Sequence, residues 1–292
     1  MTGLVQLRQG PRVDFRWLDA LWVQVTGTLC NIACRHCFIS CGPKADQVPM
    51  MTAAEVERAL EEGRDAGMRQ VYFTGGEPFL HPELPRLVRA ALALAPLTIV
   101  TNGILIDAAA AEWIAAEFRR ARYSFDLRVS LDGMTAEQND PVRGRGTFEQ
   151  VVAAVKTLAR AGLSPVVTVV EHEAGLGAAD ARARFLEFVR GLGVRQARVK
   201  FLPLLRIGRE EQRTHGYDDP DAIGGTILPE VESSLLCASG RIVTAQGVFT
   251  CPILIERADA RLGATLGDAL KPIHLGWDAC QTCVLEGLRC NT

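Results

Sequence analysis

The sequence lacks the segments that send a protein into a membrane or out of the cell. Its first residues, MTGLVQLRQGPRVDF, contain no basic stretch followed by an apolar core of signal-peptide length. The longest apolar run, around AALALAP, is too short to cross a bilayer and contains Pro96. We therefore expect a cytoplasmic protein with no membrane partner.

An excess of charge of one sign is also missing. The formal net charge is −2, and the 32 basic and 34 acidic residues are mixed along the chain. Proteins that bind nucleic acids usually carry a concentrated basic surface, so no nucleic-acid partner is expected. The sequence shows no internal repeat or low-complexity tract, and 292 residues can form one large core with a small addition.

Cysteine, in contrast, is abundant. The chain has nine cysteines and no secretion signal, which points to metal binding in a reducing compartment rather than to disulfides. The cysteines fall into an N-terminal group and a C-terminal group, which are Cys30, Cys34, Cys37 and Cys41, and Cys237, Cys251, Cys280, Cys283 and Cys290.

The N-terminal group has the spacing of an iron–sulfur site. In GTLCNIACRHCFISCGP, the first three cysteines form a CxxxCxxC pattern, which lets three thiolates converge on one inorganic core. A [4Fe-4S] cluster held by three cysteines keeps one iron free for another ligand. A fourth thiolate from Cys41 would fill that iron, so we interpret Cys41 as a neighbouring thiol and not as a ligand.

Two alternatives compete with a cluster at this group. The four positions also share one face of a helix, where free cysteine is a common buried residue, but Gly42 and Pro43 follow at once and argue against a helix. Structural zinc is the next rival, although zinc sites usually pair two CxxC-like knuckles well apart in the sequence. The spacing favours the cluster.

Predicted strands and helices alternate six times along the chain. The strands are at 21–27, 70–75, 97–103, 126–133, 165–172 and 196–204, and the helices are at 52–67, 82–94, 108–120, 147–162 and 178–193. Thr52 is the expected N-cap of the first helix, and Gly67 its stop. This alternation predicts an α/β fold, a partial (β/α)6 TIM-like barrel that is open on one side and has room for a large substrate such as a peptide.

Three of these strands end in small polar residues. GGEP at 75–78 follows a β-rich run, and its two glycines let the backbone approach a ligand with no Cβ in the way. The runs LTIVTNG (97–103) and LRVSLDG (127–133) also end in hydrogen-bonding groups. Because α/β barrels keep their chemistry at the C-terminal ends of the strands, these segments are candidates for a binding site.

The C-terminal cysteines predict a second metal site. They follow a polar stretch, 206–232, that we interpret as a bridge. RIVTAQGVFTC (241–251) predicts a β-hairpin with Gly247 in the turn, which would bring Cys237 and Cys251 together. Cys280 and Cys283 then supply a CxxC pair. Zinc remains an alternative for this site.

In this order, the motifs resemble the radical SAM (S-adenosylmethionine) superfamily, and Phe38 directly after the third cysteine adds to the resemblance. The C-terminal cysteines resemble the auxiliary-cluster extension of that family, called the twitch domain or truncated SPASM domain. The resemblance implies an N-terminal extension (1–20), a barrel (21–205), a bridge (206–232) and a small auxiliary iron–sulfur domain that contains the β-hairpin (233–292).

The resemblance also implies the ligands of two [4Fe-4S] clusters and of SAM. Cys30, Cys34 and Cys37 would hold the cluster that binds SAM, and Cys237, Cys251, Cys280 and Cys283 an auxiliary cluster, with Cys290 as an alternative to one of the CxxC pair. The GGEP loop would receive the SAM ammonium group, and Arg143 its carboxylate; the alternative for Arg143 is a solvated loop arginine. The residues of the SAM site are then Phe38, Gly75, Gly76, Glu77, Asn102, Ser130, Asp132 and Arg143.

The activity that the resemblance implies is that of a radical SAM oxidoreductase. A flavodoxin- or ferredoxin-type donor would reduce the first cluster, SAM would be cleaved to a 5′-deoxyadenosyl radical, and the radical would take a substrate hydrogen. Electron transfer to the auxiliary cluster would give oxidation or cross-linking of a peptide or small molecule. Return of a hydrogen atom, with Cys41 as a candidate donor, would give epimerisation. The alternative of another class is a zinc-binding structural or interaction module.

The motifs leave the substrate open. Only residues 1–20 precede the first predicted strand, which is short for the leader-recognition module that peptide maturases often carry. We therefore expect either a small-molecule substrate or a separate leader-recognition protein. Glu171, His172 and Arg206 follow strand ends and are candidate substrate contacts, with solvated strand-end residues as the alternative.

Overall fold

The fold is built on one nine-stranded sheet. The computed structural model describes residues 10–172, 179–217, 223–224 and 227–290. In these residues the strand order of the main sheet is β10-β9-β8-β2-β3-β4-β5-β6-β7, and β1 pairs with β11 in a separate two-stranded sheet. The strands are β1 (Arg12–Val13), β2 (Ala20–Gln24), β3 (Gln70–Thr74), β4 (Leu97–Thr101), β5 (Phe125–Ser130), β6 (Val166–Glu171), β7 (Arg198–Pro203), β8 (Gly240–Thr244), β9 (Gly247–Phe249), β10 (Arg261–Gly263) and β11 (Ile273–His274).

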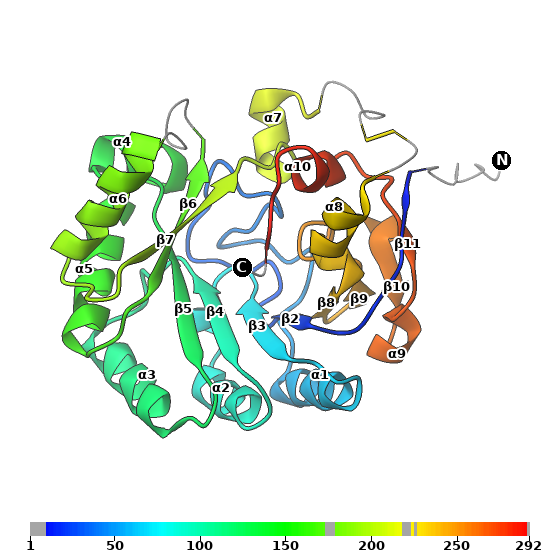
Figure 1. The fold of residues 1–292 in the computed structure, drawn as a ribbon. Coiled ribbons are helices and arrows are strands. Elements are labelled where there is room, and N and C mark those ends of the chain that lie inside the picture. Colours follow the sequence, from blue (N-terminus) through cyan, green and yellow to red (C-terminus); the bar gives the residue numbers. More distant parts are fainter. Residues whose placement is uncertain (1–9, 173–178, 218–222, 225–226, 291–292) are drawn as a thin grey trace.

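Strands β2 to β7 form the partial barrel that the sequence predicts. They are neighbours in chain order and every pair is parallel. Figure 1 shows the helices of the connections on the outer side of these strands. The α-helices are α1 (Ala53–Asp65), α2 (Leu84–Leu92), α3 (Ala108–Arg120), α4 (Ala136–Arg143), α5 (Thr147–Arg160), α6 (Ala179–Gly191), α7 (Glu211–Thr214), α8 (Pro229–Ser234), α9 (Leu266–Ala269) and α10 (Cys280–Val284).

The local signals at α1 are confirmed, whereas α4 was not predicted. Thr52 caps α1 in a capping box: its Oγ1 accepts from the Glu55 N–H at 3.2 Å, and Glu55 Oε2 accepts from the Thr52 N–H at 2.7 Å. Helix α4 contains Pro141 and mostly polar residues, so its sequence gives no helical periodicity.

Side chains alternate between two buried layers. Leu21 and Val23 of β2 belong to the core between the strands and the outer helices. Trp22 lies on the other face of β2 and stacks on Tyr72 of β3, with ring centroids 4.3 Å apart. This inner layer also contains the buried cysteines of both groups, so the barrel and the C-terminal segment share one core.

The predicted C-terminal hairpin is confirmed, but it continues the barrel sheet. Strand β8 pairs in parallel with β2, and β9 pairs antiparallel with β8. Gly247 lies one position later than expected, as the first residue of β9, with φ of +113°. A Cβ atom there would lie 2.5 Å from the Gly263 carbonyl oxygen, which explains the glycine.

No helix in the described part of the chain is long and apolar enough to span a bilayer.

Arg241 of β8 ties the hairpin to its surroundings. Its side chain is fully buried and stacks over the Phe15 ring at 4.3 Å. The guanidinium donates to four backbone carbonyls, those of Cys237 (2.7 Å), Gly240 (2.6 Å), Ala269 (2.8 Å) and Lys271 (2.8 Å). These hydrogen bonds fix the backbone of one cysteine of the C-terminal group.

We expect Arg241→Ala to destabilise the protein strongly, because it leaves several buried carbonyls without a donor. Lost and unsatisfied hydrogen bonds of this kind cost about 3 kcal/mol or more, which lowers the melting temperature of a chain of this size by about 6 °C or more. Thermal unfolding under anaerobic conditions measures the shift. The matched control is Arg160→Ala at the exposed end of α5, and equal melting temperatures for the two variants would contradict the prediction.

Candidate metal centre and cofactor site

The N-terminal cysteines lie on a loop without helix or strand, at the C-terminal edge of the barrel. We call residues 29–42 the cysteine loop. Its two ends form a parallel bridge between Leu29 and Gly42, and the Cys30 N–H donates to the Gly42 carbonyl at 3.1 Å. The helix alternative for this group is therefore wrong.

The thiols of the loop differ in the direction in which their surroundings shift their pKa values. All nine cysteines are free, and burial raises the pKa of Cys30 to about 12. Burial also raises the pKa of Cys34, and Arg143 opposes that shift. A hydrogen bond from the Cys41 thiol lowers the pKa of Cys37 to about 6, and the Cys41 N–H donates to Cys37 Sγ at 3.2 Å. A metal requires the thiolate form, which burial disfavours at Cys30 and Cys34 and the hydrogen bond from Cys41 favours at Cys37.

The place of Cys41 fits the interpretation of a neighbouring thiol. It is buried, and the hydrogen bond to Cys37 raises its own pKa far above the usual range. Three free thiols on one loop fit the donor set of a three-cysteine iron–sulfur cluster. In the described residues, no three His, Cys, Asp or Glu side chains are spaced to hold a single metal ion. A four-iron cluster binds each thiolate at a different iron, so it takes ligands that are further apart.

The two glycines of GGEP lie against the start of the cysteine loop and the residues just before it. The Gly76 N–H donates to the Gly27 carbonyl at 2.8 Å, and the Glu77 N–H to the Leu29 carbonyl at 3.0 Å. A Cβ atom at Gly76 would lie 2.0 Å from the Leu29 oxygen, and one at Gly75 2.1 Å from Thr26 Oγ1. The two glycines thus let this backbone pack closely against residues 26–29, and the close approach to a ligand stays a prediction.

Glu77 is a buried carboxylate held by neutral donors. It is 0% exposed and accepts from Thr101 Oγ1 (2.7 Å), the Asn102 N–H (2.7 Å) and the Phe79 N–H (3.0 Å). Burial raises its pKa to about 7, because these hydrogen bonds only partly offset the loss of water. A bound ammonium group would stabilise the charged form. The Asn102 amide donates to Asn31 Oδ1 at 2.7 Å and so joins this strand end to the cysteine loop.

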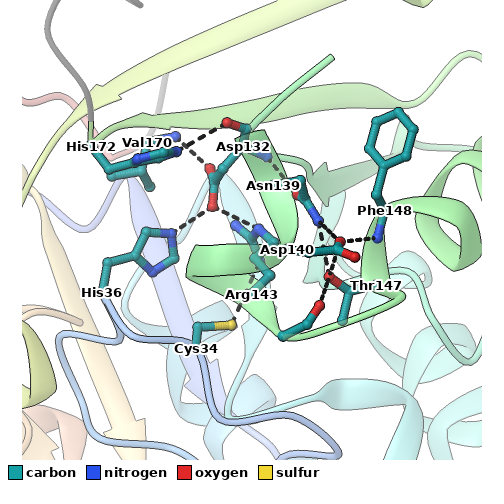
Figure 2. Close-up of polar contacts among 11 residues, drawn as sticks. Cys34, His36, Asp132, Asn139, Asp140, Arg143, Thr147, Phe148, Val170 and His172 are labelled. Atoms are coloured by element: carbon teal, nitrogen blue, oxygen red, sulfur yellow. Dashed lines mark hydrogen bonds and ion pairs between the residues drawn. The ribbon is translucent and has the colours of Figure 1, made fainter. Parts of the chain in front are cut away.

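Asp132 is the centre of a second buried network, shown in Figure 2. Its Oδ2 lies 2.6 Å from His36 Nε2 and 2.7 Å from Arg143 Nε, and its Oδ1 accepts from the Val170 N–H at 2.8 Å. The His172 ring contacts the Asp132 carbonyl at 3.1 Å. Burial alone would raise the pKa of Asp132, but Arg143 and His36 outweigh it and hold the pKa well below its usual range.

This network changes the interpretation of two predicted SAM contacts. Asp132 is 0% exposed and both of its oxygens have protein partners, so it orients Arg143 and His36; its direct contact with SAM stays a prediction. Arg143 is 6% exposed, which makes the solvated-loop alternative wrong. Its Nη1 lies 4.0 Å from Cys34 Sγ, so the guanidinium borders the cysteine loop.

The remaining predicted contacts are spread over the neighbouring strand ends. Ser130 is half-buried at the end of β5, and Phe38 is half-buried in the cysteine loop. Glu171 pairs with Arg182 of α6 at 2.7 Å, and the Arg206 guanidinium lies over the Tyr217 ring at 5.7 Å.

Sequence reasoning missed His36 and Arg209. His36 lies between Cys34 and Cys37 in the sequence, and its importance follows only from its contact with Asp132, which is distant in the sequence. Arg209 follows β7 and donates to the carbonyls of Ser40 and Cys41, at 2.9 and 2.6 Å. No local pattern marks either residue.

The C-terminal cysteines share one buried apolar pocket. All five line it, together with leucine and isoleucine side chains. Burial raises the pKa of Cys237 to about 12, and it raises the pKa values of Cys251, Cys283 and Cys290 as well. Cys290 lies in the pocket with the other four, so both predicted ligand sets have their residues together. We call this the C-terminal cysteine pocket.

Three thiols at the C-terminal edge of a partial parallel barrel, with a second cysteine pocket beside it, define an iron–sulfur class of barrel enzyme. The chain belongs to the radical SAM superfamily, whose pattern matches residues 25–188. Mycofactocin maturase MftC of Mycobacterium ulcerans is 36% identical over 150 residues, 50% of this chain and 39% of that protein. GTP 3′,8-cyclase of Chlorobaculum tepidum is 32% identical over 146 residues, 49% of this chain and 42% of that protein.

Solved structures agree on the fold. Streptococcus suis SuiB bound to its precursor peptide SuiA matches with a TM-score of 0.65 at 16% identity, over 87% of this chain and 64% of SuiB. Native anSMEcpe with bound AdoMet matches with a TM-score of 0.60 at 16% identity, over 86% of this chain and 79% of that one. The matched regions span only 39% and 42% of the two curated relatives. The superfamily match establishes the family, and the solved structures establish the fold.

We expect Glu77 to make the free energy of unfolding depend on pH. The folded state keeps this proton up to about pH 7, whereas the usual pKa of the carboxyl is 4.5. The stability from Glu77 is therefore fully present below about pH 4.5 and is lost as the pH rises through 7, by about 3 kcal/mol. The Glu77→Gln variant has no ionisable group at this position, so its free energy of unfolding lacks this dependence on pH.

Denaturant unfolding of SAM-free protein at pH 5 and pH 8 measures this difference. The stability of the wild type relative to Glu77→Gln should fall between the two pH values, and Glu83→Gln at an exposed position is the control. A relative stability that does not change with pH would contradict the assignment of a raised pKa to Glu77.

Proposed function

We propose that this chain is a radical SAM peptide maturase with two [4Fe-4S] clusters, which oxidises or cross-links its substrate. Cys30, Cys34 and Cys37 hold the cluster that binds SAM. Four thiols of the C-terminal cysteine pocket hold the auxiliary cluster, Cys237, Cys251, Cys280 and Cys283, with Cys290 as the alternative to one of the last two.

The observation that carries this proposal is the pairing of the two cysteine sites in one core. The C-terminal cysteine pocket lies behind the hairpin whose strand β8 extends the barrel sheet from β2, and the cysteine loop leaves the same β2. A barrel that needed one cluster alone would not require five thiols around one pocket on this side. Membership of the superfamily also favours clusters over the zinc-binding alternative.

The residues beside the cysteine loop suit the two charged ends of the SAM amino acid. Glu77 is a buried carboxylate that accepts hydrogen bonds from neutral donors, so it would hold the ammonium group. Arg143 lies beside Cys34, oriented by Asp132, and would hold the carboxylate. Once reduced, the bound cluster supplies the electron that cleaves SAM. The protein's part is to orient SAM and the substrate and to keep water away.

The substrate class follows from the relatives. MftC is named a mycofactocin maturase, and SuiB was solved with a precursor peptide, which supports a peptide substrate here. The match to GTP 3′,8-cyclase supports a small molecule as the second candidate. Full thiolate ligation of the auxiliary cluster would make it an electron acceptor and favour net oxidation over epimerisation. A flavodoxin- or ferredoxin-type donor and a separate leader-recognition protein are the proposed partners.

Two triple variants test the cluster assignment. Wild-type protein purified without oxygen should hold about eight irons per chain, and Cys30→Ala/Cys34→Ala/Cys37→Ala about four, with no 5′-deoxyadenosine formed from SAM. Cys237→Ala/Cys251→Ala/Cys280→Ala should also hold about four irons but should still cleave SAM and fail to modify the substrate. A colourless wild type that contains zinc would overturn the proposal.

The mass of the product tests the reaction. Reduced enzyme and SAM are incubated with candidate precursor peptides and, separately, with GTP. A peptide that is about two mass units lighter is the expected result of oxidation or cross-linking. An unchanged mass in ordinary water, with solvent deuterium incorporated in heavy water, would identify an epimerase instead. In that case Cys41→Ser should abolish the incorporation if Cys41 is the hydrogen donor.

A further inference from the structure

The segment after β7 lies directly on the cysteine loop. Gly208 has φ of +62°, and a Cβ atom there would come within 2.6 Å of the Phe38 carbonyl and 2.7 Å of the Cys37 oxygen. The next residue donates its backbone N–H to the Cys37 carbonyl at 3.0 Å. The glycine therefore brings the Arg209 backbone against the third cysteine of the CxxxCxxC pattern.

The Arg209 side chain holds both halves of the same loop. Its Nη1 donates to the Cys34 carbonyl, and its Nη2 donates to the carbonyls of Ser40 (2.9 Å) and Cys41 (2.6 Å). These carbonyls belong to a stretch that has no helix or strand of its own, and in which Ser40 adopts a positive φ of +48°. One planar guanidinium thus supplies hydrogen bonds that backbone carbonyls receive from other backbone groups in a helix or a sheet.

The charge of Arg209 is directed at the loop as well. In the part of the chain that the structure describes, no carboxylate forms an ion pair with it. Its side-chain hydrogen bonds in the described residues go to backbone carbonyls of the cysteine loop.

The same segment is anchored at its other end to the C-terminal cysteines. Tyr217 Oη lies 2.5 Å from Thr282 Oγ1, and Thr282 stands between Cys280 and Cys283 on α10. The Arg206 N–H donates to the Tyr217 hydroxyl at 3.3 Å and closes the segment. Residues 206–217, expected from their polarity to start a bridge between two domains, contact both cysteine sites.

We propose that Arg209 is a positioning residue for the cluster that binds SAM: its hydrogen bonds to three carbonyls hold the cysteine loop in the shape in which Cys30, Cys34 and Cys37 face one iron–sulfur core. This inference rests on the proposed ligation by those three cysteines. Arg209 acts through its hydrogen bonds to the backbone of the loop.

Two substitutions separate hydrogen-bond geometry from charge. Arg209→Lys keeps the charge but loses the planar fork, and Arg209→Gln loses the charge as well. The matched control is Arg213→Lys, because Arg213 lies in the same segment and pairs with Glu210 instead of the loop. Substitution of a residue that orients metal ligands typically weakens metal binding by about 10- to 100-fold.

The first measurement is the rate at which a chelator removes iron from the cluster whose EPR signal changes on addition of SAM. We expect a rate about tenfold higher in Arg209→Lys and Arg209→Gln than in the wild type and in Arg213→Lys. The second measurement uses metal-free protein, in which a thiol reagent should modify the loop cysteines faster in both Arg209 variants. Melting temperatures show whether the variants fold.

Wild-type rates in Arg209→Lys would overturn the inference, since the fork geometry would then be unnecessary. Loss of the whole fold in both Arg209 variants would overturn it too, because Arg209 would then support the barrel and not the loop in particular. The triple variant Cys30→Ala/Cys34→Ala/Cys37→Ala keeps the two proposals apart. If it retains the SAM-sensitive EPR signal, the ligand assignment itself is wrong; if it loses the signal while Arg209→Lys matches the wild type, only the role of Arg209 is wrong.

Discussion

The site depends on the cysteine loop, which has no helix or strand of its own and is held in place by contacts from other segments. Residues 29–42 contain no helix or strand, yet three of their thiols have to face one core. Segments that follow the barrel strands make these contacts. The GGEP backbone follows β3, Asp132 follows β5 and contacts His36, and Arg209 follows β7. Because these contacts come from segments after three different strands, the geometry of the site depends on the correct folding of the barrel.

The charges around the loop divide into two complementary halves. On one side, Glu77 is buried among neutral donors and its pKa is raised to about 7. On the other side, the negative charge of Asp132 is matched by Arg143 and His36, and its pKa is depressed. A zwitterionic amino acid bound between them would place its ammonium group near Glu77, which has no cationic partner among its hydrogen-bond donors, and its carboxylate near the Arg143 guanidinium. This physical match agrees with membership of the radical SAM superfamily.

Much of this architecture could be predicted from the sequence because its signals are local. Hydrophobic strands, the cap at Thr52 and the CxxxCxxC spacing each lie within a few residues. The pairing of β8 with β2 and the contacts of His36 and Arg209 join residues far apart in the chain, so no local pattern contains them. The SLDG motif did mark Asp132 as important, but only its burial and its partners show that it orients Arg143.

The most direct test of the account is the iron map of crystals grown without oxygen, measured by anomalous scattering at the iron absorption edge in the presence of SAM. The account predicts four iron positions beside Cys30, Cys34 and Cys37, three of them each bonded to one of these thiolates and the fourth bound to SAM, and four more in the C-terminal cysteine pocket. A single zinc at either place, or a protein side chain on the fourth iron of the first group, would contradict it.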